Sequence, residues 1–220
     1  MGVGRREFIR LMSMAFAGLA TDPLQAVVVH ENLYVNKRLG VLFYIPEGWG
    51  FIAVKDFGKF KDKQILATQR KGHRKKAWQD VEEPIVLATK YYEDKPEYTG
   101  VFSPTIMLFA TAKEELEYLE ADSFEELIGM SAFGASNHLK KFKITKRYEP
   151  VFISNTWFHA YDAEYLFEHV DINGPLKVEL KLLAAEHNGY YYIFNLHQSK
   201  AQNQLADREF EDFTKTIKLI

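Results

Sequence analysis

The sequence predicts an α+β fold in which an antiparallel β-sheet is covered by helices. Two Asn-Gly pairs, at residues 173–174 and 188–189, divide the C-terminal third of the chain into three apolar-rich segments. Asn-Gly is the strongest short signal for a β-hairpin, because both residues tolerate a positive φ angle. Beyond the first 26 residues, helical periodicity appears once before these segments and once after them. Hairpin-linked strands with two flanking helices indicate an antiparallel sheet with a helical cover.

The composition is that of a globular protein with a large core. The chain has 220 residues, of which 47% are hydrophobic and 15% aromatic, and its formal net charge is −2. This charge gives no reason to expect nucleic-acid binding. The absence of cysteine excludes disulfides, thiol catalysis and cysteine-ligated metal clusters. We expect a leader over residues 1–26 and a single domain over residues 27–220.

The first 26 residues have the layout of an export signal. Arg5 and Arg6 are followed by Glu7 and Phe8, as in the twin-arginine export motif, and an apolar stretch comes next. We therefore expect the twin-arginine export machinery as a partner, and a protein that is exported to the periplasm or associated with the envelope. The alternative is an uncleaved amphipathic helix that packs on the domain or lies on a membrane.

The expected elements follow from apolar spacing and turn residues. Ser123 and Glu126 form a capping box that opens a helix reaching about residue 141. Leu205, Phe210, Phe213 and Ile217 give the last helix, residues 202–219, an apolar stripe. The predicted strands cover residues 39–45, 51–54, 85–90, 105–110, 142–148, 156–170, 176–186 and 190–198.

The stretch Gly40-Val-Leu-Phe-Tyr-Ile-Pro-Glu-Gly-Trp49 resembles the opening motif of PsbP-like domains, in which a strand ends in a proline–glycine–tryptophan turn. The order of the expected elements is also similar, over about residues 32–220. The resemblance implies an α/β/α sandwich and a non-enzymatic, accessory role in the envelope. Some photosynthetic members bind metal, but none of their ligands can be matched to a residue here.

One cluster of polar residues is a candidate binding site. If Asn173-Gly174 and Asn188-Gly189 both make two-residue turns, Tyr161 pairs with Glu186, and Glu186 pairs with Tyr191. These residues and His159 then lie together at one end of the core face of the sheet. A carboxylate between two phenols and near an imidazole could bind a cation or a polar ligand. The alternative is a polar rim where the core ends.

A second candidate surface is a basic run before an acidic stretch. Arg70, Lys71, Arg74, Lys75 and Lys76 could dock an acidic partner or phospholipid headgroups. The alternative is a solvated loop.

No catalytic motif is present in the sequence, so we expect no catalytic residues, cofactor or resident metal. The function that we expect is that of an exported accessory or binding protein that contacts an envelope protein. Two alternatives remain: a small hydrolase that uses His159, Glu186 and tyrosines, and a peripheral membrane protein anchored by its N-terminal helix.

Overall fold

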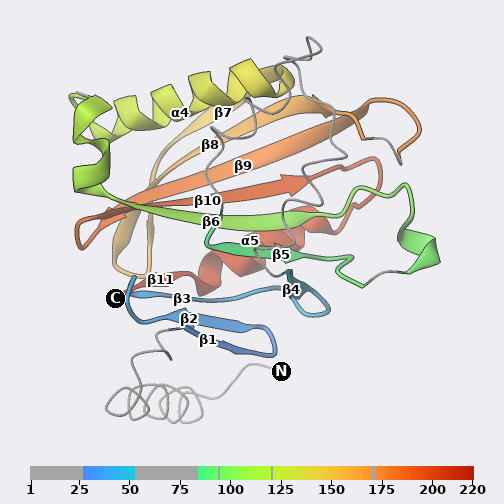
Figure 1. The fold of residues 1–220 in the computed structure, drawn as a ribbon, viewed down its shortest axis with the longest axis horizontal. Helices are drawn as coiled ribbons and strands as arrows, with labels where there is room; N and C mark the ends of the chain where they lie inside the picture. The colour runs from blue at the N-terminus through green and yellow to red at the C-terminus, as the bar shows by residue number, and fades with distance from the viewer. Residues whose placement is uncertain (1–26, 53–83, 94, 120, 170–171) are drawn as a thin grey trace.

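The computed structural model describes residues 27–52, 84–93, 95–119, 121–169 and 172–220 (Figure 1). The expected leader and the basic run at residues 70–76 lie outside these ranges. Within them, two antiparallel sheets of four and seven strands accompany two α-helices. The α+β class is therefore confirmed.

The smaller sheet has the strand order β1-β2-β3-β11. Its strands are β1 (Val27–His30), β2 (Leu33–Asn36), β3 (Val41–Tyr44) and β11 (Lys218–Leu219). The strand predicted at residues 39–45 is β3, which is central in this sheet and buried on both faces. The last helix was expected to reach residue 219, but it ends at Thr216, and the final residues pair with β3 instead.

The larger sheet has the order β4-β5-β6-β10-β9-β8-β7, and every neighbouring pair is antiparallel. Its strands, in chain order, are β4 (Gly50–Ile52), β5 (Val86–Thr89), β6 (Thr105–Ala112), β7 (Lys140–Ile153), β8 (Thr156–Phe167), β9 (Leu176–His187) and β10 (Tyr190–Gln198). Two short 3₁₀ segments, η4 (Pro96–Tyr98) and η5 (Lys113–Leu119), flank β6. The expected three-strand meander is thus one part of a wider sheet.

The two Asn-Gly turns behave differently. Asn188 and Gly189 both have positive φ, and His187 pairs with Tyr190, so this two-residue turn is confirmed. The connection from β8 to β9 instead spans residues 168–175, and Tyr161 pairs with Leu182. The predicted pair of Tyr161 with Glu186 is therefore wrong by 186 − 182 = 4 residues. Because this shift is even, every side chain keeps its predicted face.

The helices lie on opposite faces of the larger sheet. Figure 1 shows α4 (Phe124–His138) across one face, and α5 (Ala206–Thr216) with the smaller sheet on the other. The expected α/β/α sandwich overstates the helical share, because a four-stranded sheet supplies much of one outer layer.

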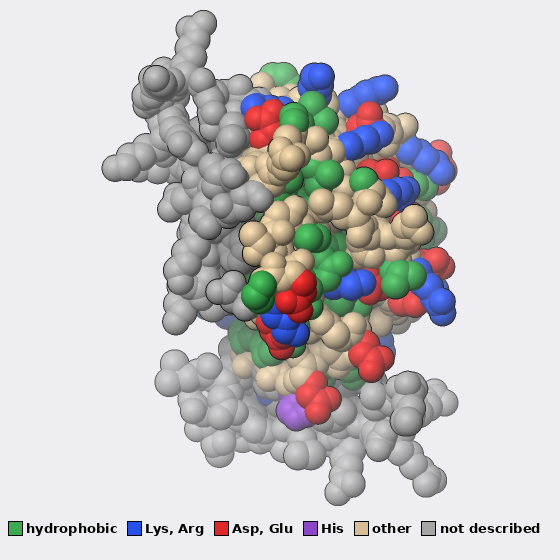
Figure 2. All heavy atoms as spheres, turned by 90° about the vertical axis from the view of Figure 1, so that its right-hand side faces the viewer, with side chains coloured by type: hydrophobic (Ala, Val, Ile, Leu, Met, Phe, Trp, Pro, Cys, Tyr) green, Lys and Arg blue, Asp and Glu red, His purple; other side chains and the backbone are tan. Residues whose placement is uncertain are grey.

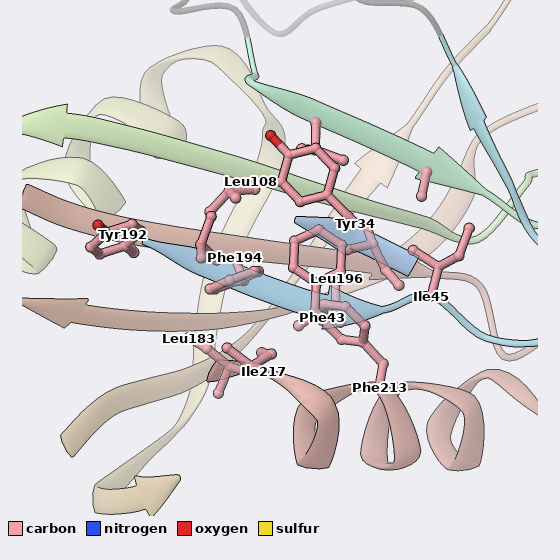
Figure 3. Close-up of a cluster of buried hydrophobic side chains, with 14 of the residues drawn as sticks. Tyr34, Phe43, Ile45, Leu108, Leu183, Tyr192, Phe194, Leu196, Phe213 and Ile217 are labelled. Carbon is pink, nitrogen blue, oxygen red and sulfur yellow. The ribbon is translucent and has the colours of Figure 1, made fainter. Parts of the chain in front are cut away.

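A hydrophobic core fills the space between the larger sheet, the smaller sheet and α5 (Figure 3). Phe43 of β3 is fully buried there and makes edge-on ring contacts with Phe194 of β10 and Phe213 of α5, at centroid distances of 5.9 and 5.4 Å. A second core lies between α4 and the other face of the sheet, and it includes Ile128, Tyr161 and Leu182. Both faces of the larger sheet therefore contribute to a hydrophobic core.

The motif at residues 40–49, which resembles the opening motif of PsbP-like domains, connects the two sheets. Pro46 to Trp49 form a turn in which the Trp49 amide donates to the Pro46 carbonyl at 3.2 Å and Gly48 has φ +78°. A positive φ at the third residue of a turn favours glycine. Trp49 then packs edge-on against Phe210 of α5, with ring centroids 5.9 Å apart. This turn leads the chain from β3 into β4.

Candidate functional site

The first residue of α4 brings together two of the predicted site residues. The capping box sets its position: the Glu126 amide donates to the Ser123 hydroxyl at 3.2 Å. The Glu126 carboxylate accepts from the Asp122 amide at 2.8 Å, rather than from Ser123 as a standard box would have it. Phe124 then lies over the sheet. Its ring stacks on Tyr191 at 4.9 Å and meets the His159 ring edge-on at 5.4 Å.

Glu186 and His159 each lie beside a charged side chain from another element. Glu186 forms an ion pair with Lys113, whose ammonium also lies 5.5 Å from the centre of the Tyr191 ring. This pair is well exposed, and Glu186 raises the pKa of Lys113, mainly through a side-chain hydrogen bond. The Nδ1 atom of His159 lies 3.4 Å from a carboxylate oxygen of Glu125. His159 and Glu186 are thus held by different partners.

Tyr161 is the predicted site residue that does not join the surface cluster. It is 2% exposed and belongs to the core beneath α4. Burial raises the pKa of Tyr161 to about 12, although the nearby Arg147 guanidinium, 6.0 Å from the ring centre, acts in the opposite direction. The structure therefore brings together His159, Glu186 and Tyr191, and places Tyr161 in the adjoining core.

A pair of exposed aromatic residues next to this cluster was not predicted from the sequence. Phe152 of β7 pairs with Trp157 of β8, and their rings lie 5.0 Å apart. They are 55% and 60% exposed. Ser154 and Asn155 form the turn between them, both with positive φ. An Asn inside a short polar break between apolar residues was the available signal for this hairpin.

Trp157 and His159 lie on the same face of β8, because side chains alternate along a strand and these two are separated by one residue. We call the surface formed by Phe124, Phe152, Trp157, His159 and Tyr191 the aromatic surface. Exposed aromatic rings beside paired charges are typical of protein interfaces. Among the described residues, no group of three or more His, Asp or Glu side chains is placed to hold a metal ion.

The opposite face of the sheet carries charged side chains around Tyr148. The Tyr148 hydroxyl donates to Asp162, and this bond is the main reason that the pKa of Tyr148 is raised to about 12. The Lys146 and Lys181 ammonium groups lie 4.3 and 5.8 Å from the centre of the Tyr148 ring. On the face drawn in Figure 2, basic and acidic side chains are interspersed over the described residues. Mixed charges of this kind do not form the one-sign field that attracts nucleic acid.

No protein-family model and no curated protein matches this chain. Solved structures do resemble it, all with low sequence identity. Cyanobacterial PsbP from Synechocystis sp. PCC 6803 has a TM-score of 0.44 and 12% identity, over 88% of this chain and 95% of that one. LpqN, involved in cell envelope biogenesis of Mycobacterium tuberculosis, has a TM-score of 0.43 and 10% identity, over 81% and 82%.

A Pseudomonas aeruginosa protein of unknown function has a TM-score of 0.44 and 11% identity, over 70% of this chain and 95% of that one. PsbP, which the sequence motif led us to expect, is thus among the structures that this chain resembles. In the described part of the chain, no helix is both long and apolar enough to cross a membrane.

Proposed function

We propose that this protein is an exported accessory protein of the cell envelope, which works by binding a partner protein rather than by catalysing a reaction. In this proposal residues 1–26 are a twin-arginine leader, and residues 27–220 are the exported domain. The observation that carries the binding role is the aromatic surface. The export role depends on Arg5, Arg6 and Phe8 in the sequence.

The exposed ring pair at the end of the β7–β8 hairpin supports binding to a protein. Phe152 and Trp157 contact one another but leave more than half of each side chain accessible. Large aromatic side chains that are exposed in a free protein supply much of the binding energy when a partner buries them. The ion pair of Lys113 with Glu186 lies beside this apolar area, as in an interface with an apolar centre and a polar rim.

The hydrolase alternative receives no support from the geometry of its residues. A general base has to lie within hydrogen-bond reach of the group that it serves. Here the His159 imidazole faces Glu125, the Glu186 carboxylate faces Lys113, and Tyr161 is buried. The membrane alternative depends on residues 1–26 and 70–76, which lie outside the described ranges.

Site-specific photo-crosslinking in the producing cell tests the binding role. A photoreactive amino acid at Trp157 is expected to give a discrete crosslinked product in the envelope fraction. The same amino acid at Arg208, 86% exposed on the remote helix α5, is the matched control and is expected to give none. The product should disappear when Phe152 is replaced by Ser. Equal products at both positions, or none at Trp157, would contradict a partner on this surface.

Two further measurements test the export route and the absence of catalysis independently of the binding role. Replacing Arg5 and Arg6 with lysine should leave the protein in the cytoplasm, and unchanged export would contradict the twin-arginine route. Purified protein should show no turnover on a panel of ester and glycoside substrates. Turnover that Glu186→Gln abolishes would favour the hydrolase alternative instead.

A further inference from the structure

The outer side of α4 exposes two large apolar side chains. Met130 is 39% exposed and Phe133 is 71% exposed, the highest value among the exposed large hydrophobic residues of the described ranges. Ile128 and Ala132, on the other side of the helix, are buried against the sheet. α4 is therefore apolar on its inner side and carries an additional apolar centre that faces solvent.

The exposed residues around this centre are spaced symmetrically along the helix. Glu126, Met130, Phe133 and Asn137 follow one another at intervals of four, three and four residues, so they share one side of the helix. All four are exposed. When two such helices lie antiparallel, this spacing places Met130 of each helix opposite Phe133 of the other, and Glu126 opposite Asn137.

Gly129 and Gly134 are placed symmetrically about the same point of the helix. Gly129 and Gly134 lie inside the helix, where glycine is unfavourable. A Cβ atom built on either would meet nothing within 4 Å, so packing inside the chain does not require them. In the sequence, the two glycines are equally far from the midpoint between Ser131 and Ala132, and so are Met130 and Phe133. Glycine next to an exposed apolar residue lets the backbone of another helix approach closely.

The two ends of α4 carry opposite charges. Asp122, Glu125 and Glu126 lie at its beginning, whereas the exposed Lys141 follows its end, next to Lys140, which is paired with Glu168. Asp122 and Lys141 are both exposed, and in the sequence they are equally far from the midpoint between Ser131 and Ala132. An antiparallel copy of α4 would bring the acidic end of each helix to the basic end of the other, and a parallel copy would oppose like charges.

We propose that the outer side of α4 binds a second copy of this chain, with the two helices antiparallel about a twofold axis. Phe133 then packs against Met130 of the partner subunit, and Asp122 lies near Lys141 of the partner subunit. A surface that is complementary to itself is what a twofold interface requires. With 15 residues, α4 is about 22 Å long, and a contact of this size forms a weak dimer.

Sedimentation equilibrium of the exported domain, from micromolar concentrations to about 1 mM, tests this proposal. We expect a concentration-dependent monomer–dimer equilibrium. Phe133→Ser should weaken association at least tenfold, and Gly134→Ala should weaken it while raising the melting temperature. Leu205→Ser, at a residue that is 62% exposed outside α4, is the control and should leave association unchanged.

Charge reversal distinguishes this geometry from another dimer. Asp122→Lys and Lys141→Asp should each weaken association, and the double variant should restore it, because each repulsive pair becomes attractive again. Melting temperatures and circular dichroism show whether each variant still folds. A monomer throughout the concentration range would overturn the proposal. A dimer that Phe133→Ser leaves intact, or that the double reversal does not restore, would also overturn it.

Discussion

The Ile220 amide donates a hydrogen bond to the Gly40 carbonyl at 2.8 Å, which joins the last residue of the chain to the turn before β3. Gly40 has φ +65°, and a Cβ atom on it would lie 2.5 Å from the Ile220 carbonyl oxygen. Both the backbone angle and the available space therefore require glycine at this position.

Gly40→Ala should lower the free energy of unfolding by about 2 kcal/mol or more, because it combines a left-handed alanine with a backbone collision. Gly48→Ala is the matched control: its φ is +78°, but a Cβ atom there would meet nothing within 4 Å. The control should cost only about 1 kcal/mol. Chemical denaturation measures both, and equal losses would show that the collision with Ile220 relaxes at no cost.

The buried His197 should make the folded protein less stable in mild acid. It is buried and lies 3.0 Å from the Tyr165 hydroxyl through Nδ1, and burial lowers its pKa from 6.5 to about 4. Above pH 6.5 the imidazole is neutral in both the folded and the unfolded chain, so His197 does not reduce the free energy of unfolding there. As the pH falls towards 4, the unfolded chain binds a proton that the folded protein does not, which favours unfolding. The predicted loss from this residue is about 3 kcal/mol.

Denaturant unfolding at several pH values checks this prediction. His197→Phe should make the dependence between pH 6.5 and pH 4 shallower by this amount. Tyr165→Phe removes the hydrogen bond but leaves the imidazole buried, so it should keep the dependence. An unchanged dependence in His197→Phe would mean that other groups cause the acid sensitivity.

Ser123 caps the helix whose first residue organises the aromatic surface. Ser123→Ala should destabilise the protein by about 1 kcal/mol, because the Glu126 amide loses its acceptor. Ser131→Ala, at an exposed position in the middle of α4, should instead be neutral or stabilising by about 0.5 kcal/mol. Thermal denaturation compares the two, and similar effects would show that the cap is not used in solution.

Phe210 and Leu205 have the same predicted role in the last helix but different environments. Phe210 is 3% exposed and contacts Trp49, whereas Leu205 is 62% exposed at the residue before α5 begins. Phe210→Ala should therefore cost about 3–5 kcal/mol, and Leu205→Ala should change stability by less than about 0.5 kcal/mol. A large effect at Leu205 would instead support the stripe predicted from the sequence.

Much of the candidate site depends on alternation along the strands, which is visible in the sequence. His159, Tyr161 and Tyr191 were assigned to the core face of the sheet, and the structure places them there. Their partners were not predictable, because Lys113 and Phe124 come from other parts of the chain. Nothing in the local sequence indicates which rings Phe124 covers.

The sequence by itself determined the features that depend on neighbouring residues. Asn188-Gly189 makes its tight turn because both residues adopt positive φ at little cost, and Ser123 with Glu126 begins a helix because their side chains satisfy free amides. Only the tertiary structure decided the register of β8 on β9, the exposure of Leu205 and the pairing of β11 with β3. Each of these depends on which apolar surfaces the whole molecule buries, and local conformational preference carries no information about that.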